Sequence, residues 1–393
     1  MERAVVTGLG CVTALGEDVP QFWDGLISGK TGIVPITGFS REFLRNPSAG
    51  EISLSPRMRA HAESRWLESR IALFADFAVC EALRSSGLSE NDIRTRKIGL
   101  VLGVSFGMSL VRDSRSNEEG RGREGFDDFS GLAGEIADRH GVTGEAITVS
   151  TACAAGTNAV SIARDMILYE GYDAVICGGA DTLDRMKYLG HSALNTLTLT
   201  SIKPFAADRD GTIFGEGAGI LVLEAERCLA SRPALAVCSG SGFSCDAYQI
   251  AAPDPSGAAA VYAMREALRN AGLEPADINY INLHGSGTHH NDSMESLAIM
   301  QVFGDGALIP ASSIKSAIGH TMGAAGGCES VATVLAVKHQ KAPPTVNVVE
   351  KDPQLPVRLV CGRAIDWKIE HALSNSFGFG GCNGTVIFSR WGR

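Results

Sequence analysis

Short apolar runs alternate along the chain with longer segments in which apolar residues recur every three or four positions. The short runs predict β-strands at residues 4–8, 98–103, 146–149, 174–178, 219–224, 278–283 and 385–388. The longer amphipathic segments predict helices at residues 66–85, 158–169, 257–271, 293–302 and 329–339. Continuous apolar strands separated by helices indicate an α/β fold with a central, mostly parallel sheet.

Three segments of the first half have counterparts, in the same order, in the second half. Residues 5–10, 151–156 and 177–180 correspond to residues 237–242, 319–326 and 379–382. Each match alone is explained by the similarity of any two Gly-rich and Ala-rich turns, but three in order favour a duplicated α/β unit. We therefore predict two halves, 1–225 and 226–393. The charged segment 112–128 is expected to be an exposed insertion or a partner contact.

Composition narrows the possible partners. The chain has 393 residues, enough for about two to three compact units, and a net charge of −9. The 46 glycines have no period, so they are expected in tight turns and at close backbone contacts rather than in a fibrous chain. This net negative charge argues against binding to nucleic acid or to an anionic membrane. A partner is then small or held by a local basic patch.

The cysteines do not form a recognisable metal or redox motif. The ten cysteines are never closer than seven positions apart, so no CxxC pair exists, and most are expected to be small buried thiols of a reducing cytosol. Residues 1–7 enter a strand directly, without the features of a signal peptide. The longest uncharged stretch, 146–163, contains too many hydroxyl and amide side chains for a membrane span. We predict a cytoplasmic protein.

Cys153 stands where a predicted strand meets a predicted helix, flanked by alanines that are too small to cover it. The unpaired N–H groups at a helix start favour negative charge, so this position suits a nucleophilic thiolate. A buried cysteine packed among alanines at the helix start is the alternative.

Three further segments end strands in Gly-rich turns. His284 precedes Gly285 and Gly287 at a strand end, where α/β sheets present groups to ligands, although a structural histidine capping the turn fits equally well. Lys315 and His320 lie five residues apart, and Glu329 is a candidate partner for a buried Lys315. The Gly-dense segment around Phe379 can aim backbone N–H groups at an oxyanion.

Together, these segments resemble the β-ketoacyl-[acyl-carrier-protein] synthases of the thiolase superfamily, in the elongating class with a Cys-His-His triad. The resemblance runs from residue 5 to residue 388. It implies a thiolase-like fold in which two duplicated α/β halves form a layered αβαβα core. Initiating synthases carry Asn at the position of His320, so elongation is implied.

The resemblance also implies a role for each residue. Cys153 would accept an acyl group as a thioester, and His284 and His320 would hold the malonyl thioester carbonyl through decarboxylation. The backbone N–H groups of Cys153 and Phe379 would form the oxyanion hole. Lys315 would order His320 and Glu329. No metal or redox cofactor is implied, because the phosphopantetheine arm belongs to the acyl carrier protein.

Some positions depart from the family pattern. Ser286 replaces a usual Thr, and with Thr288 it would offer hydroxyls to the pantetheine. Phe106 and Met108 fall where the family lines the acyl pocket, and the ring of Phe106 would shorten it, favouring a short, flat or polyene primer. His289 and His290 are expected at the surface or entrance. Cys382 replaces a Thr and raises a degradative thiolase as an alternative, which the His320 segment disfavours.

An acidic carrier protein would need a basic rim. Lys203 by resemblance, and clustered arginines including Arg65 and Arg70, with Arg57 and Arg59, are the candidates; solvated helix-face charges are the alternative. The family dimerises, and we expect the strand containing residues 174–180 to form that contact, in a homodimer or a heterodimer. The pathway stays open between a specialised type II polyketide or polyene route and housekeeping fatty-acid elongation. A non-catalytic subunit of the chain-length-factor type is disfavoured by the retained triad.

Overall fold

The computed structural model describes residues 2–65, 67, 69–105, 131–229, 232–304 and 309–392. The strands are β1 (Ala4–Val12), β2 (Val34–Pro35), β3 (Ser48–Ala49), β4 (Ile98–Gly103), β5 (Ala146–Val149), β6 (Ala174–Asp181), β7 (Gly217–Ala225), β8 (Ala236–Cys245), β9 (Tyr280–Asn282), β10 (Pro310–Ser312), β11 (Lys341–Ala342), β12 (Arg358–Leu359), β13 (Ile365–Asp366), β14 (His371–Phe377) and β15 (Cys382–Arg390).

The helices are α1 (Val19–Ile27), α2 (Pro56–Arg65), α3 (Arg70–Ser86), α4 (Glu90–Thr95), α5 (Gly131–His140), α6 (Ala155–Tyr169), α7 (Arg185–Ala193), α8 (Ala258–Ala271), α9 (His289–Phe303), α10 (Lys315–Ile318) and α11 (Ala325–His339). Short 3-10 turns precede α6 and α11, at Ala152–Ala154 and Met322–Ala324, and another spans Phe379–Gly381. The segment 106–130, which includes the predicted insertion, lies outside the described residues.

One large sheet with the order β12-β10-β9-β14-β15-β8-β1-β7-β6-β4-β5 organises the molecule. From the first strand of each half outward, the order is β1-β7-β6-β4-β5 on one side and β8-β15-β14-β9-β10 on the other. When only these five strands of each run are numbered in chain order, both runs read first, fifth, fourth, second and third. The two runs meet where β1 pairs antiparallel with β8 at Val5 and Val6.

The sheet is mixed, so the expectation of a mostly parallel sheet is wrong. Parallel pairing is confined to the outer strands, β4 with β5 and β6, and β9 with β10 and β14, together with β10 and β12. The central pairings, from β6 through β7, β1, β8 and β15 to β14, are antiparallel. The last strand of each half runs back between the first and the fourth, which reverses its direction.

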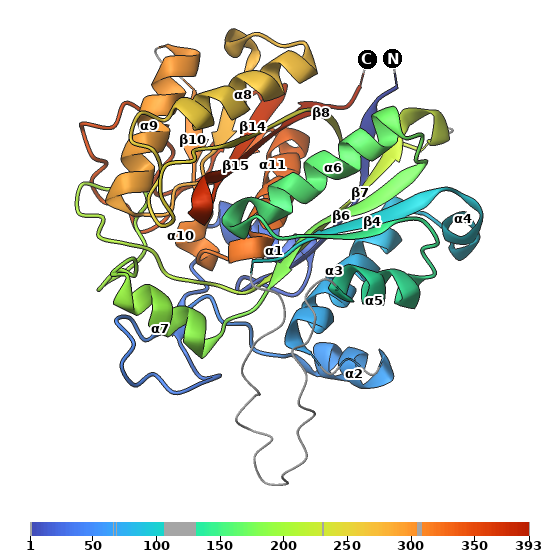
Figure 1. Ribbon diagram of the computed structural model, residues 1–393, viewed down its shortest axis with the longest axis horizontal. Helices are drawn as coiled ribbons and strands as arrows, with labels where there is room; N and C mark the ends of the chain where they lie inside the picture. Colours follow the sequence, from blue (N-terminus) through green and yellow to red (C-terminus); the bar gives the residue numbers. More distant parts are fainter. Residues whose placement is uncertain are drawn as a thin grey trace, which may run out of the picture.

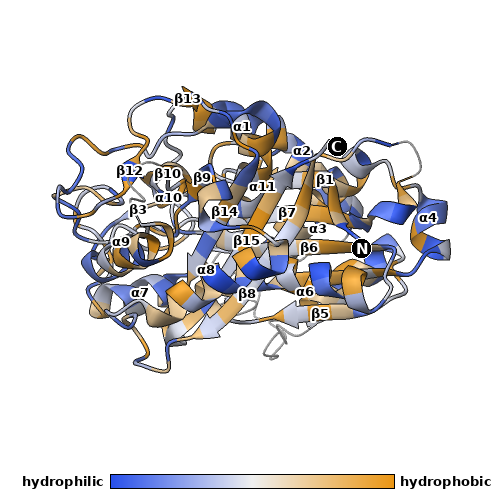
Figure 2. Cartoon of the chain, turned by 90° about the horizontal axis from the view of Figure 1, so that it is seen from above, coloured by the Kyte–Doolittle hydropathy of each residue, from blue (hydrophilic) through white to orange (hydrophobic). Residues whose placement is uncertain are grey.

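Helices lie in three layers: one covers the outer face of each half of the sheet, and one lies between the two halves (Figure 1). α3 and α5 cover one face of the first half, α8 covers the second half with α9 packed on it, and α6 and α11 lie between the halves. In Figure 2 the strands are largely hydrophobic, whereas the exposed α4 is hydrophilic. This arrangement is the layered α/β fold with two similar halves that the sequence predicts.

α6 and α11 approach each other closely at their first turns. A Cβ at Gly156 would lie 2.6 Å from the backbone nitrogen of Gly327, and one at Gly326 would lie 2.2 Å from the backbone nitrogen of Thr157. Neither contact leaves room for alanine. The starts of both central helices are therefore held together by backbone contact.

β6 has neighbours on both edges, β4 along Ile98–Gly103 and β7 along Gly217–Ala225. The expectation that the strand holding residues 174–180 joins a second copy is therefore wrong, because its backbone groups are already paired. The outer strand of this half is β5. No helix in the described ranges is long and apolar enough to cross a membrane.

Candidate active site

Cys153 lies in the 3-10 turn between β5 and α6, as the sequence predicts. The preceding Ala152 has a φ of 49°, in the left-handed region, which turns the chain sharply before the helix. The backbone N–H of Phe379 donates to the Cys153 sulfur. An ideal Cβ on Gly378 would lie 3.0 Å from the Cys153 nitrogen, so the Phe379 turn and the start of α6 are in backbone contact.

The N–H groups at the start of α6 were expected to lower the pKa of the Cys153 thiol. The structure does not bear this out. Burial raises the pKa to about 11, and the charge of Lys315 and the N–H of Phe379 offset that effect only in part. Desolvation of the charged form outweighs the favourable dipoles here. Cys153 is therefore mostly a thiol in the free protein.

His284 follows β9 and is held from two sides. Its backbone N–H and that of Gly285 each donate to the carboxylate of Glu295, at 2.8 Å. Its ring Nδ1 lies 3.3 Å from Lys315 Nζ, which also donates to the His284 carbonyl oxygen at 2.5 Å. Because the ammonium group has no lone pair, Nδ1 is the acceptor and the ring proton is on Nε2.

His320 sits on the turn before α11, with its ring centroid 5.3 Å from that of His284 and the two rings nearly perpendicular. Its Nδ1 accepts the backbone N–H of Met322 at 3.1 Å, which again leaves the proton on Nε2. Burial, followed by the charge of Lys315, lowers the pKa of both imidazoles well below its ordinary value. Both rings are therefore neutral N–H donors at neutral pH.

The Lys315–Glu329 ion pair expected from the sequence is present, and both side chains are fully buried. Burial raises the pKa of Glu329, and the Lys315 charge opposes the shift. Lys315 also contacts His284 directly, a contact that the sequence did not predict. Its charge acts on His320 as well.

Sequence reasoning missed two buried carboxylates of α9 that shape the His284 turn. Glu295 binds the backbone of His284 and Gly285, and burial raises its pKa to about 7. Asp292 accepts the backbone N–H groups of Phe205 at 2.8 Å and Gly287 at 3.2 Å. The sequence did contain a signal for them, since two acidic residues stand three positions apart in a helix that follows a Gly-rich turn.

The remaining predicted site residues have varied surroundings. Ser286 and Thr288 share a hydrogen bond of 2.9 Å, and Thr288 also caps α9 by accepting from Asn291. His289 and His290 are exposed on the first turn of α9. Cys382 is half-buried at the start of β15. Phe106 and Met108 lie outside the described residues.

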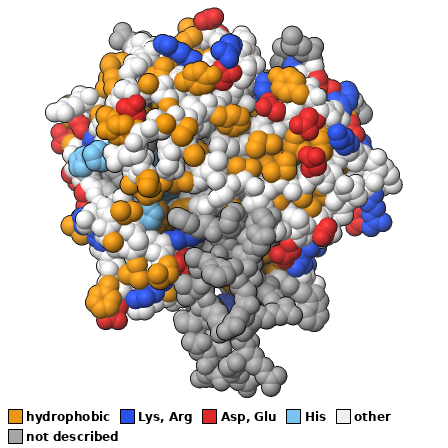
Figure 3. Space-filling view, in the orientation of Figure 1, with side chains coloured by type: hydrophobic (Ala, Val, Ile, Leu, Met, Phe, Trp, Pro, Cys, Tyr) orange, Lys and Arg blue, Asp and Glu red, His pale blue; other side chains and the backbone are white. Residues whose placement is uncertain are grey.

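The basic residues proposed for docking are engaged in ion pairs. Arg65 donates to the buried Asp76 at 3.0 Å, and Arg70 donates to the buried Glu216 at 2.9 Å. Lys203 is 13% exposed and pairs with Asp208 at 2.5 Å. The structure thus gives Arg65 and Arg70 a role in joining elements of the fold. On the described part of the face in Figure 3, basic and acidic side chains are interspersed.

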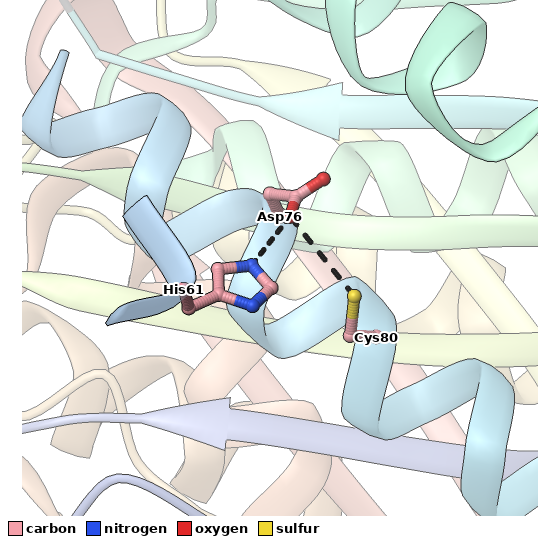
Figure 4. Close-up of side chains that lie close together, drawn as sticks. All are labelled: His61, Asp76 and Cys80. Atoms are coloured by element: carbon pink, nitrogen blue, oxygen red, sulfur yellow. Dashed lines mark hydrogen bonds and ion pairs between the residues drawn. The ribbon is translucent and has the colours of Figure 1, made fainter. Parts of the chain in front are cut away.

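One group in the described residues has the geometry to hold a metal ion: His61, Asp76 and Cys80, on α2 and α3 (Figure 4). Asp76 already accepts from His61 at 2.6 Å, from His140 at 2.9 Å and from Arg65. Its oxygens are thus occupied by donors, one of them a permanent cation. This donor set does not fit a metal site, and the group is a network that joins α2, α3 and α5.

Comparisons with known proteins agree on one family. The models "Beta-ketoacyl synthase, N-terminal domain" and "Beta-ketoacyl synthase, C-terminal domain" match residues 1–227 and 235–349. A curated relative from Synechocystis sp., 3-oxoacyl-[acyl-carrier-protein] synthase 2, is 35% identical, and the match covers 99% of this chain and 98% of the relative. The protein of the same name from Coxiella burnetii is 33% identical with the same coverage.

Solved structures with the same fold include polyketide enzymes. The ishigamide ketosynthase/chain length factor matches with a TM-score of 0.88 and 32% identity, over 100% of both chains. The type II polyketide ketosynthase AntDE, in complex with its acyl-carrier protein, matches with a TM-score of 0.89 and 29% identity, over 99% of this chain and 100% of that one.

Proposed function

Because this chain belongs to the β-ketoacyl synthase family, whose members are acyltransferases, we propose that its Cys153, His284 and His320 carry out a decarboxylative condensation in a specialised type II pathway. The family resemblance read from the sequence is confirmed. The observation that supports this assignment of roles is that the Nδ1 atoms of both buried imidazoles face donors, Lys315 Nζ and the Met322 N–H, which leaves Nε2 of each ring to donate.

The first half-reaction loads the enzyme. The Cys153 sulfur attacks the acyl thioester of a carrier protein, the bond from the acyl carbon to the pantetheine sulfur breaks, and the Cys153 proton leaves with the pantetheine thiol. The backbone N–H groups of Cys153 and Phe379 would stabilise the oxyanion of the tetrahedral intermediate. The contact of Phe379 N–H with the Cys153 sulfur supports this placement.

The second half-reaction forms the new carbon–carbon bond. As malonyl carrier protein loses CO₂, negative charge develops on its thioester oxygen, and the Nε2–H groups of His284 and His320 would donate to it. Neutral donors in a buried pocket need no reorganisation as the charge appears. The enolate carbon attacks the acyl carbon on Cys153, the bond from that carbon to the Cys153 sulfur breaks, and the sulfur takes up a proton from water. The 3-oxoacyl product, two carbons longer, stays on the carrier protein.

The specialised pathway is supported by two kinds of evidence. The structures that match at full length include the ishigamide ketosynthase/chain length factor and a ketosynthase in complex with its chain length factor from Xenorhabdus doucetiae. Phe106 is expected to shorten the acyl pocket and so favour a short or polyene primer. The curated relatives at 33% to 35% identity support housekeeping fatty-acid elongation as the second candidate.

The test is to offer a panel of acyl carrier proteins and to measure the mass of the acyl-enzyme. We expect short or polyunsaturated primers to load Cys153 faster than long saturated ones, and equal loading would contradict the specialised pathway. Cys153→Ala should abolish 3-oxoacyl product while it still decarboxylates malonyl carrier protein. A Cys153→Ala enzyme that still forms 3-oxoacyl product would overturn the assignment of Cys153 as the nucleophile. The retained nucleophile would then no longer distinguish this chain from a chain-length-factor subunit.

A further inference from the structure

Two cysteines face each other across neighbouring strands at the end of the sheet next to the Phe379 turn. Cys245, the last residue of β8, is in register with Cys382, the first residue of β15 (strands visible in Figure 1). The ladder bond beside them runs from the Asp246 N–H to the Gly381 oxygen at 2.9 Å, so the two cysteines occupy a non-hydrogen-bonded position. At such positions the Cα atoms lie about 4.5 Å apart with both side chains on one face.

That spacing suits a covalent bond between the two sulfurs. Disulfides join residues whose Cα atoms are about 4.4–6.8 Å apart. Burial raises the pKa of the Cys382 thiol, and the nearby Cys245 raises it further. The two strands therefore hold the thiols in place before any bond forms.

Accessibility distinguishes this pair from the other close thiols. Cys245 is exposed and Cys382 is half-buried. Cys11 and Cys328 also approach each other, but both are completely buried, where an oxidant in solvent does not reach them. Cys361 is exposed, and its sulfur contacts the backbone oxygen of Leu359.

Both cysteines lie at the base of the turn that carries Phe379. The Cys382 carbonyl accepts the Gly378 N–H at 2.7 Å, and the Cys245 sulfur lies 3.7 Å from the Gly380 oxygen. Gly380 and Gly381 have φ values of 79° and 77°, a left-handed backbone that glycine adopts without strain. The Gly380 N–H also bonds the Ile250 carbonyl at 2.7 Å, which links the turn to the segment after β8.

We propose that Cys245 and Cys382 form a reversible disulfide that fixes the Phe379 turn and slows the acylation of Cys153. With hydrogen peroxide as the oxidant, the exposed Cys245 thiolate attacks one peroxide oxygen, the O–O bond breaks, and a sulfenic acid and hydroxide form. The Cys382 thiol then attacks that sulfur and water leaves. Two thiols are oxidised to one disulfide and one peroxide is reduced to two waters, with the protons retained in the water.

Disulfides in reducing compartments are mostly transient and redox-sensing, and a thiol reductant would reverse this one. The covalent step depends only on the strands, whereas its effect on rate rests on the proposed function. The two claims have separate readouts, so failure of one is distinguishable from failure of the other.

The experiment treats the full chain with hydrogen peroxide and maps peptides without reduction. We expect a cross-linked peptide containing Cys245 and Cys382, two hydrogens lighter than the separate peptides, that disappears with dithiothreitol. It should be absent in Cys245→Ser and Cys382→Ser and unchanged in Cys361→Ser, the matched exposed thiol. Failure to recover this peptide from the wild-type chain would overturn the proposal.

The rate is then measured as acyl-enzyme formation on Cys153 before and after oxidation. Acylation should fall several-fold in the cross-linked protein, recover with dithiothreitol, and stay unaffected in Cys245→Ser treated in the same way. Equal loss in Cys245→Ser would assign the effect to oxidation of Cys153 itself and would overturn the regulatory claim. Unchanged acylation in the fully cross-linked wild-type protein would also overturn the regulatory claim.

Discussion

His284 and His320 differ in what holds their Nδ1 atoms. An ammonium group faces the Nδ1 of His284, whereas a backbone N–H donates to the Nδ1 of His320. Both arrangements leave the proton on Nε2, and burial keeps both rings neutral. The site thus obtains two equivalent donors from two unrelated local structures.

Removal of either donor should cost a similar amount. His284→Ala and His320→Ala should each slow the decarboxylation of malonyl carrier protein by about 10²–10³, the usual effect of losing one oxyanion donor. Release of CO₂ and acylation of Cys153 are measured separately, and acylation should be much less affected. His289→Ala, which removes an exposed imidazole on the adjacent helix turn, is the control. Decarboxylation at the wild-type rate in His320→Ala would exclude its role as a donor.

The pKa of Cys153 predicts how its reactivity changes with pH. With a pKa of about 11, the thiolate fraction grows tenfold for each pH unit through the neutral range. The rate of alkylation by iodoacetamide at Cys153, followed by peptide mass mapping, should therefore rise with pH without levelling off below about pH 10. A plateau near pH 8 would mean that the dipole at the start of α6 outweighs burial.

At this scale the sequence predicted which Cys, His and Lys side chains the structure brings to the candidate site, because these residue types are visible at Gly-rich strand ends. It could not predict Glu295, which acts only on the backbone of His284 and Gly285 and so belongs to no side-chain motif. It also assigned Arg65 and Arg70 to the docking surface, because a sequence does not distinguish an arginine on an exposed helix face from one that pairs with a buried carboxylate.

At the scale of elements, α2, α3 and α5 are joined through the buried Asp76. Burial alone would raise the pKa of Asp76, but hydrogen bonds from His140 and His61 and the charge of Arg65 outweigh it and hold the pKa well below its usual range. A carboxyl whose pKa is lowered by folding stabilises the native state above the pKa of the unfolded chain, about 4. That contribution is lost as the pH falls below this value.

Asp76→Asn should accordingly lower the free energy of unfolding by about 2–3 kcal/mol at pH 7, since it removes charged hydrogen bonds. The difference from the wild-type protein should shrink as the pH falls below about 4. Urea unfolding at several pH values measures both effects. Glu63→Gln, which neutralises an exposed acid of α2, should change the stability little. A deficit that persists undiminished in acid would point to packing rather than charge.

The elements that sequence patterns predicted are the ones with apolar runs. β14 was not predicted because Ser374, Asn375 and Ser376 interrupt the pattern. The structure buries these polar groups by pairing them: the Thr385 hydroxyl donates to Asn375 at 2.8 Å, and Asn282 donates to the Ser374 hydroxyl at 3.1 Å. The pattern could not predict the strand directions either. Alternation of strands and helices does not reveal that the last strand of each half, β7 or β15, runs antiparallel to both of its neighbours.

At the scale of the whole molecule, the proposed function requires a chain with a net charge of −9 to bind an acidic carrier protein. Lys203 remains a candidate for this contact, but its partner Asp208 is 73% exposed while Lys203 itself is mostly covered. The pair presents its acidic member outward. Charge changes at these two positions should thus have opposite effects on docking.

Lys203→Glu should raise the KM for acyl carrier protein several-fold, and Asp208→Asn should lower it, because the second change leaves the cation unopposed. Initial rates with carrier-bound substrate and with a free acyl thioester measure the two effects. The free thioester should show neither effect, since it lacks the acidic carrier. Parallel changes for both substrates would locate Lys203 in the acyl path instead of the docking surface.

The duplicated turns before α6 and α11 show how far the two halves have diverged. Ala152 and Met322 share the same left-handed backbone, with φ values of 49° and 52°, and each opens a 3-10 turn that leads into a central helix. Where the first turn has Cys153 the second has Gly323, and a Cβ there would lie 2.4 Å from the Ser105 nitrogen. A second thiol has no room in this fold. The repeat of the two turns is therefore a repeat of the backbone alone: the start of α6 has room for a thiol, and the matching position before α11 has none.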